Sequence, residues 1–277
     1  RQRQMCIRDS YPAEYGAALL TSVGDDKDKM ALYLSDMRAQ HIKVLPPDVN
    51  ASSLEFTAVG EDIRFGLGAI RNVGASAVND IIATRQEHGP AKDFFEFLDR
   101  VPLGVCNKRL IESLIKAGAF DSMGHSRRGL MAVYEQAVDA ATELKRNEAN
   151  GQDDLFGMGA TDAPPELGVE RVVPEEDWER RTKLSFEREM LSLYVSDHPL
   201  RGMESILEAE RDVPLARLVS EDGPREGTVT VVGMVTQIVR RTTKNGDIWA
   251  SVTIEDLDAT FNVACFPRVC LLYTSDA

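Results

Sequence analysis

Long apolar runs, paired cysteines and an excess of basic residues are all missing from this 277-residue chain. No apolar stretch approaches the roughly 20 residues of a membrane-spanning helix, so we expect no transmembrane segment. No apolar run follows the basic start, which argues against a secretory signal peptide. The formal net charge of −13 argues against a chain coated throughout for nucleic acid, so any DNA contact must come from local basic patches.

The cysteines are few and scattered, with no Cys-X-X-Cys pair among Cys6, Cys106, Cys265 and Cys270. This scatter argues against a zinc site and a disulfide framework, and it fits a reducing, cytoplasmic compartment. The length suggests about two domains. A hydrophobic content of 43% and a charged content of 28% are those of an ordinary globular protein.

The two ends differ in pattern from the sequence beside them. Residues 1–10 form a basic, uncapped run, and residues 270–277 interrupt a strand pattern. Both ends resemble peptides translated from sequencing-library adapters, so we expect them to be non-native. Cys6 and Cys270 are then expected to carry no function, and the remainder is expected to be an internal piece of a longer protein.

The most informative stretch is residues 63–85, for which we predict two short helices joined by a tight turn at Asn72-Val73-Gly74. Gly74 is free to adopt a positive φ, and Asn72 is of a type that tolerates it. Such a turn leaves the first amide groups of the second helix unpaired. Together with the helix dipole, these amides form an anion-binding site.

This pattern is typical of a helix-hairpin-helix, a module that binds the nucleic-acid backbone without reading sequence. Small residues after the turn leave room for a phosphate, and arginines flank the turn. The predicted backbone-binding residues are Arg71, Asn72, Val73, Gly74, Ala75, Ser76 and Arg85. The alternative is a plain helical hairpin without a ligand, because a glycine between two amphipathic helices is common.

A second pair of helices is predicted to repeat the first in outline, which suggests a tandem arrangement. Its first helix covers residues 93–100, and its second begins at Lys108, with Asn107 as N-cap and Gly118 as C-cap. One more amphipathic helix is expected at residues 126–147. Three basic residues of the second pair are candidate phosphate contacts or ordinary surface charges: Lys108, Arg109 and Lys116.

A linker composition, rich in Asn, Gly, Asp, Ala and Pro, covers residues 148–174. It is interrupted by Gln152-Asp153-Asp154-Leu155-Phe156. Two adjacent large apolar residues in a linker are candidates for insertion into a partner's pocket, with Gln152 at the rim. The alternative is that Leu155 and Phe156 fold back onto the preceding helices.

Toward the C-terminal end the apolar pattern changes to a period of two. We expect strands at residues 228–239, 248–255 and 260–266, with a hairpin turn at Lys244-Asn245-Gly246. Such a meander is the beginning of a small barrel such as an OB-fold. Because an OB-fold has five strands and two are missing here, we expect an open sheet edge and a poorly covered apolar face.

Basic residues beside aromatic ones in this meander suit single-stranded nucleic acid. The predicted single-strand-binding residues are Arg240, Arg241, Lys244, Trp249 and Phe261. Core packing is the alternative for both Trp249 and Phe261.

Taken together, these motifs resemble the DNA polymerase III alpha subunit family from about residue 11 to residue 269. The most specific stretches are IRFGLGAIRNVG, NKRLIESLIKAGAFD, QDDLF and EREMLSLYVSDHPL. The implied domains are residues 11–55 (end of the fingers), 56–123 (tandem helix-hairpin-helix), 124–200 (helix, linker and helix) and 201–269 (start of a truncated OB-fold). The expected fold class is mainly α followed by a truncated all-β OB-fold, a multi-domain α+β arrangement.

The resemblance implies roles in DNA replication. Arg71 to Ser76 would hold the duplex that leaves the active site, and Arg240, Arg241 and Lys244 would lie near the single-stranded template. Gln152, Leu155 and Phe156 would bind the sliding clamp (the beta subunit). Further partners would be the other subunits of the polymerase III holoenzyme, in the cytoplasm and without membrane contact.

The family's nucleotidyl transfer needs acidic residues that hold Mg²⁺ in a palm domain, and no palm sequence is found here. We therefore expect no catalytic residue, no metal site and no cofactor in this chain, and no primer extension by it alone. Two alternatives stay open. One is a stand-alone adaptor that binds DNA and the clamp, and the other is a piece of the error-prone paralogue, against which the intact Gln152-X-X-Leu155-Phe156 argues mildly.

Two departures from the family pattern weaken these roles. Asn72 stands where many helix-hairpin-helix turns carry glycine, and Asp153 and Asp154 place charge inside the clamp motif.

Overall fold

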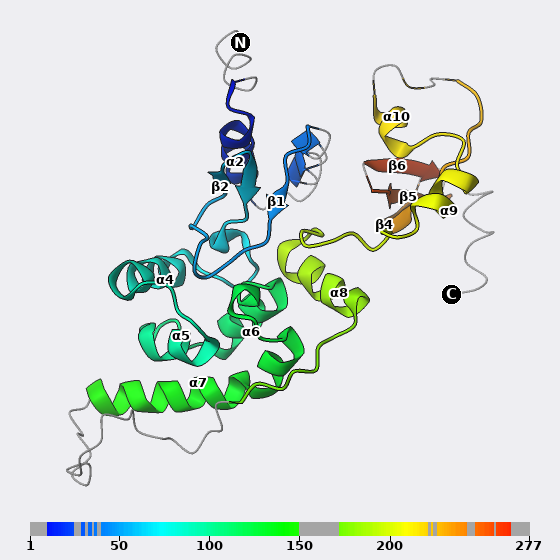
Figure 1. Cartoon of the computed structure of the whole chain (residues 1–277). Coiled ribbons are helices and arrows are strands. Elements are labelled where there is room, and N and C mark those ends of the chain that lie inside the picture. Colours follow the sequence, from blue (N-terminus) through cyan, green and yellow to red (C-terminus); the bar gives the residue numbers. More distant parts are fainter. Residues whose placement is uncertain are drawn as a thin grey trace. The chain divides into compact units, whose positions relative to one another are not determined.

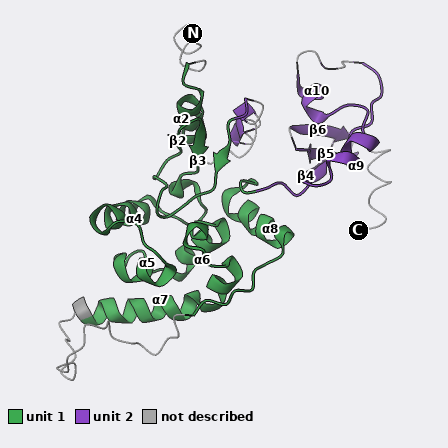
Figure 2. Ribbon diagram, in the orientation of Figure 1, with its two compact units in different colours: residues 1–27, 42–196 green, residues 28–41, 197–277 purple. Residues whose placement is uncertain are grey.

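The computed structural model describes residues 10–24, 29–30, 33–34, 36–37, 40–149, 172–220, 223, 226–242, 247–257 and 259–266. The chain divides into two compact units, which Figure 2 shows in different colours. The first unit comprises residues 1–27 and 42–196, and the second comprises residues 28–41 and 197–277. Within the described residues, no helix combines the length and apolar character that crossing a membrane requires.

The first unit opens with helix α2 (Pro12–Val23) and a small sheet of three short strands. These are β1 (Val44–Leu45), β2 (Thr57–Val59) and β3 (Asp62–Arg64). The central strand β3 pairs in parallel with β1 and antiparallel with β2. Figure 1 shows these elements in blue and cyan.

The prediction of a helix from Ile63 to the turn is wrong. Ile63 is buried in strand β3, and only the short 3-10 helix η1 (Leu67–Ala69) follows it. The amides of Leu67 and Gly68 donate to the carbonyls of Ser53 and Leu54, each at 2.9 Å. Because these bonds hold the chain against a neighbouring segment, its amides are not available for an α-helix.

The helices of the first unit form its main core. They are α4 (Ala75–His88), α5 (Phe94–Arg100), α6 (Lys108–Ala117), α7 (Arg127–Ala149) and α8 (Arg180–Leu191), with the 3-10 helix η2 (Asp121–Met123) before α7. Helix α6 packs against both α7 and α8 (Figure 1). The apolar stripe of α6 is fully or nearly fully buried, and it consists of Leu110, Ile111, Leu114 and Ile115. Burial of each such side chain contributes about 1.5–3 kcal/mol to the free energy of folding.

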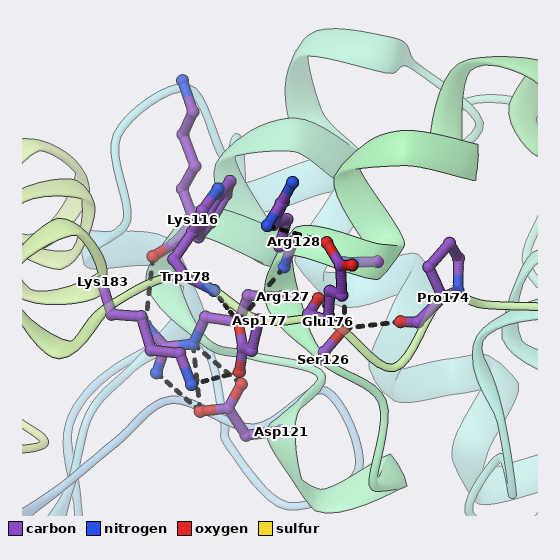
Figure 3. A network of polar contacts seen from close by, with 11 residues as sticks. Lys116, Asp121, Ser126, Arg127, Arg128, Pro174, Glu176, Asp177, Trp178 and Lys183 are labelled. Atoms are coloured by element: carbon purple, nitrogen blue, oxygen red, sulfur yellow. Dashed lines mark hydrogen bonds and ion pairs between the residues drawn. The ribbon is translucent and has the colours of Figure 1, made fainter.

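A polar network fastens residues 172–178 to the start of α7, as Figure 3 shows. Ser126 Oγ lies 2.8 Å from the carbonyl oxygen of Pro174 and accepts from the amide of Gly129 at 3.0 Å. Gly129 has no space for a side chain, since a Cβ there would overlap the Pro174 carbonyl. The segment around Pro174 therefore lies beside the N-terminal end of α7.

Two ion pairs complete this attachment. Arg128 pairs with Glu176 at 3.0 Å, and Lys183 of α8 pairs with Asp177. The amides of Arg128 and Trp178 also donate to the Asp177 carboxylate. Burial by itself raises the pKa of Asp177, but these hydrogen bonds outweigh it and lower the pKa below its ordinary value.

From residue 197 onward, the described part of the second unit comprises short helices followed by an antiparallel meander. These are α9 (Glu204–Glu210), α10 (Leu215–Val219), β4 (Met234–Thr242), β5 (Ile248–Glu255) and β6 (Thr260–Cys265), with the strand order β4-β5-β6. The predicted strand at 248–255 is confirmed, and the strand predicted at 260–266 differs by one residue. A mainly α chain with a small C-terminal antiparallel sheet is therefore confirmed.

The first strand of the meander begins at Met234 and not at residue 228 as predicted. Met234 pairs with Glu255, which is the last residue of β5, so the ladder between β4 and β5 ends there. The amide of Thr230 donates instead to Asp212 at 2.7 Å.

Candidate nucleic-acid interface

The turn before α4 exposes the first amide groups of that helix. Gly74 is the N-cap, in an extended conformation, and no described side chain caps the helix. The first helical hydrogen bond runs from the amide of Val78 to the carbonyl of Gly74, at 3.1 Å. Gly74, Ala75 and Ser76 are exposed. The amides of this first turn therefore face outward at the positive end of the α4 dipole, where an anion is favoured.

The residue with positive φ in this turn is Asn72, at 65°, whereas Gly74 has φ −85°. Of the two residues that the sequence offered for a positive φ, Asn72 adopts it and Gly74 does not. A Cβ at Gly74 would meet no atom within 4 Å. The fold therefore does not require glycine here, and what glycine provides is open space beside the amides.

Contacts from two other helices hold the turn in place. The side-chain amide of Asn72 donates to Ser113 Oγ of α6 at 3.1 Å, and the backbone amide of Arg71 donates to the carbonyl of Met190 of α8 at 3.0 Å. Val73 is buried. Asn72 and Val73 thus position the turn, while the backbone amides and the Arg71 side chain face outward. The sequence analysis missed Ser113 and Met190, because only tertiary packing brings them to the turn.

One exposed arginine lies beside the turn, and another lies on the face of α6 that contacts the turn. Arg71 is exposed beside the turn itself. Arg109 is exposed in the first turn of α6, four residues before Ser113 and so on the same face of that helix. Because Ser113 contacts Asn72, this face of α6 meets the turn.

Arg85, which was predicted to flank the site, is not brought to the turn. It lies ten residues beyond Ala75, or about 15 Å along the helix axis. Its Nη1 donates to the carbonyl of Val49 at 3.1 Å. Burial lowers the pKa of this guanidinium, and Asp48 acts in the opposite direction. Arg85 therefore joins α4 to the segment before β2.

The second hairpin differs from the first because its helix is capped by a side chain. Asn107 Oδ1 accepts from the amides of Arg109 and Leu110, at 2.9 and 3.4 Å, which confirms the predicted N-cap. Two lysines that were candidate phosphate contacts are in ion pairs: Lys108 with Asp139 at 2.8 Å and Lys116 with Glu112 at 2.6 Å. The hydrogen bond that Lys108 donates to Asp139 raises the pKa of Lys108.

In the sheet of the second unit, the predicted single-strand-binding residues divide between two faces. Arg241 pairs with Trp249 across β4 and β5, and its guanidinium lies 5.8 Å from the centre of the Trp249 ring. Arg240 is adjacent in sequence and so faces the opposite side. Phe261 pairs with Ile254 and shares the face of Arg240. A cluster in the sequence is thus not a cluster in space.

Several predicted residues lie outside the described residues: Gln152, Leu155, Phe156 and Lys244. Among the residues that the structure describes, no group of three or more His, Cys, Asp or Glu side chains could hold a metal ion.

The fold and the exposed turn define the structural class to which this part of the chain belongs. A family model described as a helix-hairpin-helix motif matches residues 41–130, which include the turn and helices α4, α5 and α6. This chain therefore contains a helix-hairpin-helix motif.

Comparison with curated proteins gives the family. The chain is 48% identical over 273 residues to the DNA polymerase III alpha subunit of Mycobacterium tuberculosis, covering 98% of this chain and 23% of that protein. It is 52% identical over 269 residues to the subunit of Saccharopolyspora erythraea, with 95% and 22% covered. For Thermus aquaticus the identity is 38% over 264 residues, with 95% and 21% covered.

The chain is homologous to one segment of the DNA polymerase III alpha subunits, and the resemblance drawn from the sequence is confirmed. The chain spans about a fifth of the length of the curated relatives it matches.

Proposed function

We propose that this chain is the part of a replicative DNA-directed DNA polymerase that binds the backbone of duplex DNA through the turn at Gly74. The observation that carries the proposal is the open N-terminal end of α4, with Gly74, Ala75 and Ser76 exposed and no described side chain capping the helix. Backbone amides donate to phosphate oxygens whatever the base sequence, so binding is expected to be independent of sequence.

The charges around the turn suit a phosphate. Arg71 beside the turn and Arg109 on the adjoining face of α6 are exposed cations, whereas Lys108 and Lys116 are held in ion pairs. The chain as a whole carries a net charge of −13, so the contact depends on this local arrangement. Affinity for duplex DNA is expected to fall steeply as the salt concentration rises.

The substitution Gly74→Asp tests this proposal. Aspartate is a favourable N-cap residue, so the variant is expected to fold at least as stably as the parent chain. Its carboxylate would bond the amides of α4 and repel a phosphate, so duplex affinity should fall about tenfold or more, with a shallower salt dependence. Fluorescence anisotropy with a labelled duplex measures both quantities.

The matched control is Asn107→Asp, which adds the same charge at the N-cap of the second hairpin. Since Asn107 already caps α6, this change should affect duplex affinity much less than Gly74→Asp. Equal affinities and salt dependences for the parent chain and Gly74→Asp would overturn the proposed backbone contact.

We further propose that Gln152, Leu155 and Phe156 bind the sliding clamp. The support is the sequence pattern and the relationship to polymerase III alpha subunits. Replacing Leu155 and Phe156 by alanine should weaken binding to a purified bacterial clamp by about 100-fold or more. The control Asp154→Ala should bind normally, because its carboxylate is expected to stay in solvent. Unchanged affinity of the double variant would defeat this contact.

We also propose that the β4-β5-β6 sheet is the beginning of an OB-fold and contacts the single-stranded template. The support is the antiparallel meander together with its exposed basic and aromatic residues. In this proposal the chain acts with other holoenzyme subunits in the cytoplasm, and its parent enzyme carries the Mg²⁺-dependent palm. A primer-extension assay with Mg²⁺ should show no nucleotide incorporation by this chain alone, and incorporation would contradict the domain assignment.

A further inference from the structure

Two aromatic rings and a guanidinium meet at one end of the β4-β5-β6 sheet. Ala250 pairs with Cys265 in the register of β5 and β6, so the next residues outward, Trp249 and Phe266, are on one face and opposite each other. Their ring centroids are 6.4 Å apart and their planes differ by only 25°. Arg241, the partner of Trp249 on β4, lies with its guanidinium over the Trp249 ring.

This end of the sheet is open to solvent. Phe266 is 64% exposed, although it is a large aromatic residue, and Arg241 is also exposed. Farther along the same face, Ser251 lies between Val239 and Ala264, and beyond them Thr253 Oγ1 donates to Asn262 Oδ1 at 2.7 Å. A flat aromatic surface, a cation and polar groups therefore follow one another on this face.

The other face of the sheet has a different character. Ile238, Val252, Ile254, Phe261 and Val263 alternate onto it, so it is mainly apolar. Phe261 is part of this apolar surface. A base stacked on Trp249 could not also stack on Phe261, because the sheet separates them.

We propose that Arg241, Trp249 and Phe266 form a stacking platform for single-stranded nucleic acid. The inference rests on the proposed single-strand contact of the sheet. It keeps Arg241 and Trp249 from the prediction and adds Phe266. It leaves out Arg240 and Phe261, which lie on the opposite face. A base stacks on the exposed side of Phe266, and the Arg241 guanidinium binds the adjacent phosphate. The parallel rings and the neighbouring cation favour nucleic acid over a protein partner, which the apolar face would suit better.

The experiment uses the whole chain in a Trp178→Phe background, so that Trp249 is the only tryptophan. Titration with oligo-dT should quench Trp249 fluorescence, and labelled oligo-dT gives the affinity by anisotropy. Phe266→Ala and Arg241→Ala should each weaken binding about tenfold. Circular dichroism checks that the variants keep their sheet.

Matched controls come from the opposite face. Arg240→Ala removes another exposed arginine one position away, and Ile248→Ala removes an exposed apolar side chain. Neither should change affinity by more than about twofold.

Three outcomes would overturn the platform. The platform is wrong if oligo-dT binds and neither Phe266→Ala nor Arg241→Ala changes its affinity. It is also wrong if Arg240→Ala weakens binding as much as Arg241→Ala does. In both cases the single-strand contact stands. If oligo-dT neither binds nor quenches Trp249, the single-strand contact fails as well. If Phe266→Ala alters only the oligomeric state seen by sedimentation, this surface contacts protein instead.

Discussion

The side chain of Asn72 joins the turn before α4 to Ser113 in the middle of α6, through a hydrogen bond of 3.1 Å. Asn72 also has the positive φ that reverses the chain. One residue thus shapes the turn locally and attaches it to a helix 41 positions away. The orientation of the open amides of α4 depends on both properties.

Replacing Asn72 separates these two properties. Asn72→Gly keeps the backbone conformation and loses the bond to Ser113, which should cost about 1 kcal/mol of unfolding free energy. Asn72→Ala also loses the bond and keeps a Cβ in the left-handed region, which alanine tolerates less well than asparagine, so it should cost about 1–2 kcal/mol more than Asn72→Gly. Urea unfolding of both variants measures the difference. Equal stabilities would show that the turn relaxes to another conformation.

Arg127 is the buried cation at the start of α7, and its loss should be severe. Only 4% of it is exposed, its guanidinium bonds Asp121 at 2.6 and 2.9 Å, and Glu187 lies close enough to interact with it. Burial alone lowers the pKa of Arg127, but the bonds to Asp121 outweigh it and raise the pKa. Arg127→Met leaves the buried Glu187 carboxylate without its cation and should cost about 3–5 kcal/mol.

The adjacent residue provides the control for this prediction. Arg128 is 54% exposed in its pair with Glu176, so Arg128→Met should cost less than about 1 kcal/mol. Thermal unfolding compares the two variants. Similar losses would mean that the buried network contributes no more than a surface pair.

Gly118, the C-cap of α6, should tolerate alanine much less well than Gly124. Both have positive φ, at 81° and 77°, so alanine strains the backbone equally at the two positions. A Cβ at Gly118 would also overlap the Arg127 guanidinium, whereas one at Gly124 would meet no atom within 4 Å. Gly118→Ala should therefore be less stable than Gly124→Ala by about 1 kcal/mol or more, because it also disturbs the Arg127 bonds. Equal melting temperatures would contradict this.

Glu187 should make the first unit less stable as the pH rises. Burial raises the pKa of this carboxyl above its ordinary value, although hydrogen bonds from Ser196 and the charge of Arg127 oppose the shift. Between the ordinary and the raised pKa, the folded state binds more protons than the unfolded state. The unfolding free energy contributed by Glu187 is therefore greatest below the ordinary pKa and decreases as the pH rises through the raised one.

The variant Glu187→Gln isolates this effect, because it removes the titrating group and keeps a side chain that can bond Ser196. The stability of the parent chain relative to Glu187→Gln should decrease over the pH range that begins at the ordinary pKa of a glutamate, about 4. Urea unfolding followed by Trp178 fluorescence, in a Trp249→Phe background, reports on this unit. A constant difference across this range would show that Glu187 has the same pKa in both states.

Local signals in the sequence predicted several elements correctly. Asn107 caps α6 and Gly118 ends it, as expected, because a cap depends on residues within one turn of the helix. Strand β5 also matches its prediction, because alternation over eight residues is a strong pattern. The family resemblance likewise came from short motifs and their order.

The errors have a common cause, which is competition between a local preference and a distant partner. The helix predicted at Ile63 is absent because Ile63 pairs with Val44 and the next amides bond to residues 53 and 54. Arg85 was predicted at the DNA site, but Val49 supplies a carbonyl that binds its guanidinium.

By itself, the sequence determined helix α6 with its caps, strand β5 of the meander and the homology to polymerase III alpha subunits, because each depends on neighbours along the chain. Only the tertiary structure decided that Asn72 supplies the positive φ and bonds Ser113, that Arg85 bonds the carbonyl of Val49, and that Phe266 lies beside Trp249. These outcomes depend on which distant groups meet, and packing and strand register decide that.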